Sequence, residues 1–161
     1  MKASLYLETT IVSYLVARPS RDAMTAGYQA ATLEWWNRRL KNFEVFISDV
    51  VLSEAAAGDA RYAKKRLDAL ARFPLLRPTP KSQSLTHALV DSGVLPAKAA
   101  RDAAHIALAA AHEVHFLLTW NCRHIANAEM LRQVARVCRA HGLECPVVCT
   151  PHELMGGLGN E

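Results

Sequence analysis

The sequence predicts an α/β fold with a parallel sheet of about five strands and helices on both faces. Short apolar runs with strand-like alternation take turns with helical segments along the whole chain, and parallel strands need crossover helices between them. The 161 residues, 51% hydrophobic and 21% charged, match one globular domain in length and composition. No internal repeat or linker divides the chain, so we expect a single domain over residues 1–161.

The first half of the chain is predicted to hold two strands and four helices. Strands are expected where apolar residues alternate or run together, and helices where an apolar face repeats after a capping residue. Asp49 is interpreted as the N-cap of the helix after the second strand, and Gly58 as its stop. In chain order the segments are strand 3–7, a helix from Thr9 or Thr10, a helix from Asp22 to Leu40, strand 43–48, helix 49–58 and helix 60–72.

The second half is predicted to hold three strands and three helices. The helix that starts at Pro96 is almost entirely alanine on its inner side. Small side chains allow close packing, so we expect this helix deep in the fold. In chain order the segments are strand 75–77, helix 81–92, helix 96–113, strand 115–119, helix 127–141 and strand 146–150.

A five-stranded sheet of this kind is expected in the strand order 3-2-1-4-5. In that order, ligands bind in the crevice between the carboxyl ends of the first and fourth strands. The first strand ends at Glu8 and the fourth ends at Thr119 to Asn121. The chemistry is therefore expected around these residues.

Three carboxylates and one amide are the candidates for that crevice, and oxygen ligands of this kind favour Mg²⁺ or Mn²⁺ over zinc. Neighbouring carboxylates would repel one another without an ion. A cation held this way can activate water, which points to a phosphodiester substrate. The candidates, each with its structural alternative, are Glu8 (helix capping), Glu54 (a solvated helix face), Asp102 (pairing with Lys98) and Asn121 (a turn).

Four segments resemble the PIN-domain family in order and spacing, and together they cover essentially the whole chain. The resemblance is closest to bacterial PIN-domain ribonucleases of toxin–antitoxin pairs. It implies the 3-2-1-4-5 sheet, a Mg²⁺ or Mn²⁺ site and metal-dependent RNA cleavage. The segments are YLETTIVSYL, FISDVVLSEAAAGD, AARDAAHIALAAAHEVHFLLTWNCRHIAN and VVCTPHEL.

Carried over by position, the resemblance assigns the metal and catalytic site to Glu8, Glu54, Asp102 and Asn121. Thr10 and Thr119 match hydroxyl positions that orient the site. Glu8 stands where the family usually has Asp, and the neutral Asn121 stands where many members have a fourth acid. We therefore expect an endoribonuclease, and the alternative is a catalytically weakened module that binds RNA or a protein.

The charge balance and the resemblance together suggest RNA, a second copy of the chain and an antitoxin as binding partners. A net charge of +4 and a pI near 9.0 are compatible with RNA. The adjacent Trp35 and Trp36 favour a homodimer, and the resemblance implies the same and an antitoxin partner. The chain has no signal-peptide pattern and no long apolar run, so we expect a cytoplasmic protein with no membrane partner. The side chains expected to contact RNA, or else to be ordinary solvated surface, are Arg18, Arg21, Lys98, Arg101, Arg123 and His124.

Two further features have competing interpretations. His105, one turn after Asp102, is expected to be a hydrogen-bonded core histidine rather than a ligand or proton shuttle. The C-terminal third offers a zinc-like spacing, which would make the chain a zinc-stabilised interaction protein. Buried cysteines commonly behave as small hydrophobes, which favours simple burial. The residues of that spacing are Cys138, His141, Cys145 and Cys149.

Overall fold

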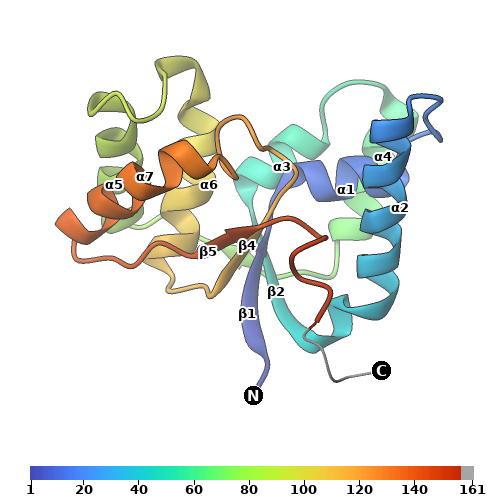
Figure 1. Cartoon of the computed structure of the whole chain (residues 1–161), viewed down its shortest axis with the longest axis horizontal. Helices are drawn as coiled ribbons and strands as arrows, with labels where there is room; N and C mark the ends of the chain where they lie inside the picture. Colours follow the sequence, from blue (N-terminus) through green and yellow to red (C-terminus); the bar gives the residue numbers. More distant parts are fainter. Residues whose placement is uncertain (157–161) are drawn as a thin grey trace.

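A computed structural model describes residues 1–156, and a sheet of five parallel strands lies at its centre (Figure 1). The strand order is β3-β2-β1-β4-β5, which confirms the predicted topology. Leu5 pairs with Val45 on one side and with Phe116 on the other, so β1 is the middle strand. The strands are β1 (Ala3–Leu7), β2 (Phe43–Ser48), β3 (Leu75–Leu76), β4 (Phe116–Leu118) and β5 (Val147–Cys149).

The helices of residues 1–156 cover both faces of this sheet. They are α1 (Thr9–Val16), α2 (Ala23–Arg38), α3 (Asp49–Ala55), α4 (Ala60–Leu70), α5 (Pro80–Asp91), α6 (Ala100–Ala111) and α7 (Ala128–Ala140). Helices α5, α6 and α7 lie on one side, and α1, α2 and α4 lie on the other (Figure 1). Two short 3₁₀ turns, Leu40–Asn42 and Ala97–Ala99, precede β2 and α6.

Side-chain caps begin several helices where the sequence predicts them. Asp22 caps α2 and Asn127 caps α7, each by accepting a hydrogen bond from a backbone N–H of the first turn. The predicted cap of α3 is wrong: Ser48, the last residue of β2, accepts this bond instead. Asp49 is the first helical residue, and its carboxylate lies 3.6 Å from the guanidinium of Arg77.

Helix α6 begins later than predicted but is buried as expected. Pro96 precedes the 3₁₀ turn, and the α-helix starts at Ala100. Pro fixes its own φ and lacks an N–H, so it suits the entry to either kind of helix. The fully or nearly fully buried alanines of α6 are Ala103, Ala107, Ala109 and Ala110.

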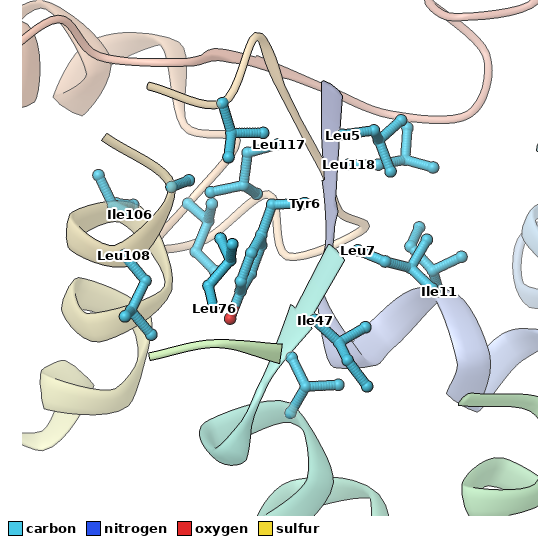
Figure 2. Close-up of a cluster of buried hydrophobic side chains, with 14 of the residues drawn as sticks. Leu5, Tyr6, Leu7, Ile11, Ile47, Leu76, Ile106, Leu108, Leu117 and Leu118 are labelled. Carbon is cyan, nitrogen blue, oxygen red and sulfur yellow. The ribbon is translucent and has the colours of Figure 1, made fainter. Parts of the chain in front are cut away.

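The hydrophobic core lies on both faces of the central strands (Figure 2). Leu5 and Leu7 point toward the side of α1, whereas Tyr6 and Leu117 point toward Ile106 of α6. This alternation follows from the two-residue period of a strand. Tyr6 is fully buried, so its hydroxyl needs partners inside the protein.

The carboxyl ends of β1, β4 and β5 are tied together beyond the strands themselves. The backbone N–H of Glu8 donates to the carbonyl of Leu118 (3.1 Å), and that of Thr119 donates to the carbonyl of Cys149 (3.0 Å). Glu8 and Thr119 are therefore neighbours at the edge where the crevice is predicted. No helix in residues 1–156 combines the length and apolar character needed to cross a membrane.

Candidate metal and catalytic site

The Glu8 carboxylate is anchored through one of its two oxygens. Oε2 accepts hydrogen bonds from the backbone N–H of Thr10 (3.1 Å), from the Thr10 hydroxyl and from the Thr119 hydroxyl (2.7 Å). The side chain thus caps α1, as the capping alternative predicts, and yet the residue is only 3% exposed. Burial raises the pKa of Glu8, and the hydrogen bonds from Thr10 and Thr119 offset part of this effect.

The two hydroxyls are themselves oriented by the backbone after β4. Thr10 Oγ1 accepts from the N–H of Trp120 (2.8 Å), and Thr119 Oγ1 accepts from the N–H of Asn121 (2.9 Å). A hydroxyl that accepts from an N–H is free to donate its own hydrogen. Both hydrogens are therefore directed at Glu8, and the backbone from Thr119 to Asn121 fixes the orientation of the carboxylate.

Glu54 is anchored in the same one-sided manner. Its Oε1 accepts from the Thr9 hydroxyl (2.7 Å) and lies 2.6 Å from Nε2 of His105. The side chain is 23% exposed, so it is neither on a solvated face nor fully buried. Partial burial raises the pKa of Glu54, but the combined effects of His105, Thr9 and Arg101 outweigh it and hold the pKa below its ordinary value.

Asp102, Asn121 and His124 form a hydrogen-bonded cluster. Asp102 Oδ1 accepts from Asn121 Nδ2 (3.1 Å), and Oδ2 lies 3.0 Å from His124 Nδ1. Asn121 Oδ1 accepts from the backbone N–H of His124 (3.0 Å). The alternative partner of Asp102 is wrong, because Lys98 makes no ion pair with it within residues 1–156.

The four predicted residues lie in two hydrogen-bonded clusters and do not all converge on a single point. Glu8, Asp102 and Asn121 belong to one cluster, and Glu54 with Thr9 and His105 belongs to the other. Ligand atoms of Glu8, Glu54 and His105 lie within 4.8 Å of one another, and no other group of three or more acids, histidines or cysteines in residues 1–156 is this close. Asp102 lies outside this group. It is joined to Glu8 through Asn121 and Thr119.

The donor set at Glu8 and Glu54 fits a hard divalent cation. Two ligands of one such ion are separated by about 4–5 Å at most, since each lies about 2.0–2.6 Å from the metal. Among the hydrogen bonds of residues 1–156, Glu8 Oε1 and Glu54 Oε2 accept none, so each carboxylate keeps an oxygen for a ligand. Two close carboxylates repel one another, and a cation between them would remove that repulsion.

Tyr6 and Thr9 were not predicted from the sequence to belong to this site. His105 was predicted only as a core residue, without a role at the site. His105 is fully buried and hydrogen-bonded, as expected of a core histidine, but its partner is the candidate ligand Glu54. One signal in the sequence was available. Tyr6 places a hydroxyl among the leucines of an apolar strand, and a buried hydroxyl requires a hydrogen-bond partner.

The remaining predicted residues are located as follows. The positive charge of Arg101 helps to lower the pKa of Glu54. His124 is half-buried against Asp102. The cysteines and His141 do not gather into a ligand group within residues 1–156, so the zinc alternative has no geometric basis there. The five cationic side chains predicted to contact RNA are all exposed: Arg18, Arg21, Lys98, Arg101 and Arg123.

Comparisons with known proteins show a likeness in fold. No family model matches the sequence, and no curated protein matches it. Among solved structures, the chain is similar to VapBC2 from Rickettsia felis bound to a DNA fragment from their promoter, with 17% identity and a TM-score of 0.53. The match covers 91% of this chain and 97% of that chain. The observed architecture thus matches the PIN-like fold that the sequence led us to expect.

Proposed function

We propose that this chain is a Mg²⁺- or Mn²⁺-dependent endoribonuclease that cleaves RNA phosphodiesters by hydrolysis. The observation that carries the proposal is the pair of carboxylates at the carboxyl edge of the sheet, each anchored through one oxygen with the other left for a ligand. The PIN-like fold supports the same reaction class, because ligands of such parallel sheets bind at this edge.

The proposed metal and catalytic residues are Glu8, Glu54, Asp102 and Asn121, with Thr10 and Thr119 in support. A bound divalent cation would supply Lewis acidity that activates water and neutralises charge on the phosphate. Glu8 and Glu54 would hold it through their unoccupied oxygens. Asp102 lies outside the 4.8 Å group, so we place it at the rim of the site, where Asn121 and His124 hold it in position.

Substrate and partners are part of the same proposal. Cationic side chains at this edge would bind RNA phosphates, which gives salt-dependent and largely sequence-blind affinity. Because the similar Rickettsia felis structure is a VapBC2 assembly on promoter DNA, we include an antitoxin partner and a homodimer in the proposal. The side chains proposed to contact RNA are Arg18, Arg21, Lys98, Arg101, Arg123 and His124.

The test compares RNA cleavage by the purified full chain in Mn²⁺, in Mg²⁺ and in EDTA. Glu54→Gln and Asp102→Asn should each lower the rate by about 100-fold or more, since even outer partners of a metal site cost 10–100-fold. The matched controls are Glu34→Gln and Asp68→Asn, which change exposed members of surface ion pairs and should leave the rate unchanged. Equal cleavage by Asp102→Asn and the wild type would remove Asp102 from the site.

A second candidate function rests on Asn121 and Asp102. The neutral amide contributes no charge to the site, and both oxygens of Asp102 already have protein partners. These features favour a PIN-like module that binds RNA or a protein without cutting it. RNA binding that persists in EDTA, with no cleavage at any Mn²⁺ or Mg²⁺ concentration, would support this function over the nuclease.

A further inference from the structure

A buried chain of hydrogen bonds runs from β2 to the candidate ligand Glu54. The Ser48 hydroxyl lies 2.7 Å from the Tyr6 hydroxyl, which lies 2.7 Å from Nδ1 of His105. Nε2 of the same ring lies 2.6 Å from Glu54 Oε1. Ser48, Tyr6 and His105 are at most 1% exposed, so water does not compete for these bonds. We refer to Ser48, Tyr6 and His105 as the buried relay.

The chemistry of the groups fixes the direction of the bond that reaches Glu54. An ionised carboxylate can only accept, so Nε2–H of His105 donates to Glu54 Oε1. Behind it, Nδ1 of the same ring shares a hydrogen bond with the Tyr6 hydroxyl, which shares a second one with the Ser48 hydroxyl. Ser48 Oγ also accepts from the backbone N–H of Val51 (3.3 Å), so each polar group of the relay is satisfied.

We propose that Tyr6 and His105 are positioning residues that hold Glu54 Oε1 so that Oε2 faces the metal site. This inference rests on the proposed function, because it concerns the ligand geometry of that site. Two donors, the Thr9 hydroxyl and His105, converge on Oε1 and leave the carboxylate little freedom to turn. Removing His105 leaves Thr9 as its only anchor within residues 1–156.

Folding stability alone does not explain the buried relay. Replacing both partners of a buried hydrogen bond by apolar groups of similar shape can be nearly neutral for folding. The double variant Tyr6→Phe with His105→Leu removes both members of the Tyr6–His105 hydrogen bond and should therefore fold. Its melting temperature should lie below that of the wild type, because Glu54 and Ser48 each lose one hydrogen-bond partner. Mn²⁺ affinity, measured on the folded variant, then separates a positioning role from a structural one.

The experiment measures the Mn²⁺ dissociation constant of the full chain from the electron paramagnetic resonance signal of free Mn²⁺. His105→Leu and the double variant should bind Mn²⁺ about 10–100-fold more weakly, the usual effect of losing a partner behind a metal ligand. His105→Gln keeps an N–H donor near the position of Nε2 and should recover much of the affinity. Tyr14→Phe and His112→Gln, which change the same residue types outside the relay, should bind as the wild type does.

Three outcomes would overturn the proposal. Wild-type affinity in a folded His105→Leu or double variant would show that Glu54 needs no relay. Equal weakness of His105→Gln and His105→Leu would show that the ring itself, and not its N–H, is required. If the wild type binds no Mn²⁺, the proposed metal-dependent function is contradicted, and Mn²⁺ affinity no longer tests the positioning role. A metal-free crystal structure of the double variant then decides, since an unmoved Glu54 carboxylate would contradict the positioning role and a displaced one would support it.

Discussion

At the scale of single residues, the two carboxylates of the site respond to burial in opposite ways. Glu8 is almost fully enclosed, and its pKa is raised because burial dominates. Glu54 is partly exposed and receives hydrogen bonds from His105 and Thr9, and its pKa is lowered. The folded protein therefore disfavours the charge on Glu8 and favours the charge on Glu54.

Glu8→Gln should stabilise the metal-free protein at neutral pH. The raised pKa means that the folded state holds the Glu8 proton more tightly than the unfolded chain, so wild-type stability falls as pH rises above the ordinary carboxyl value of 4.5. Each unit of the shift contributes about 1.4 kcal/mol, or roughly 3–6 °C in melting temperature. Melting curves in EDTA between pH 4 and 8 should show the variant's advantage growing with pH.

Glu54→Gln should have the opposite effect on folding stability. Its lowered pKa contributes stability above the unfolded value, and this contribution is lost as pH falls. The variant should therefore be less stable than the wild type at neutral pH, and the difference should shrink toward acid pH. Parallel pH profiles for the two variants would contradict the assignment of opposite shifts.

Among the elements, helix α6 combines a tightly packed face with two residues of the site. Ala103, Ala107 and Ala110 let the helix lie close to its neighbours, chiefly α5. The same helix carries Asp102 in its first turn and His105 one turn later. Close packing of the alanine face thus helps to fix where these two side chains lie at the carboxyl edge of the sheet.

Ala107→Leu should lower the free energy of unfolding by about 1–3 kcal/mol, because added methyl groups overpack a filled core. Ala107 is fully buried on α6. The control is Ala100→Leu at the exposed start of the same helix, which should change stability by less than about 0.5 kcal/mol. Chemical denaturation of the two variants measures both values, and equal losses would show that the helix is not packed as described.

At the scale of the whole molecule, the parallel sheet gives the domain two unlike edges. All five strands point the same way, so their carboxyl ends, with Glu8 after β1 and Thr119 after β4, lie at one edge. Lys41 precedes β2 and so lies at the amino edge. The net charge of +4 does not indicate which edge of the sheet would bind RNA. The proposed RNA contacts require binding at the carboxyl edge.

Arg101→Gln should weaken RNA binding more than Lys41→Gln, although both remove one positive charge. Binding of a single-stranded RNA is measured in EDTA by fluorescence anisotropy at several salt concentrations. Loss of one phosphate contact should reduce the slope of log K against log salt by about 0.7 for Arg101→Gln, with no change for Lys41→Gln. Equal effects would mean that RNA responds to net charge and not to the carboxyl edge.

Much of the architecture could be predicted from the sequence because it depends on local patterns. Apolar alternation located the strands, and the capping residue Asp22 located the start of α2. The misplaced cap of α3 marks the limit of this approach. Ser48 and Asp49 are both good capping residues, and only the end of the pairing between β2 and β3 decided that Ser48 takes the role.

The fold class, the strand order and the edge at which Glu8 and Thr119 meet could be predicted from periodicity and the rules of parallel sheets. The hydrogen bonds of Asp102 with Asn121 and His124, and of Glu54 with His105 and Tyr6 behind it, are visible only in the folded protein. These partners are up to 99 residues apart along the chain. Their contacts depend on the packing of α6 against the sheet and on side-chain rotamers, which no local pattern encodes.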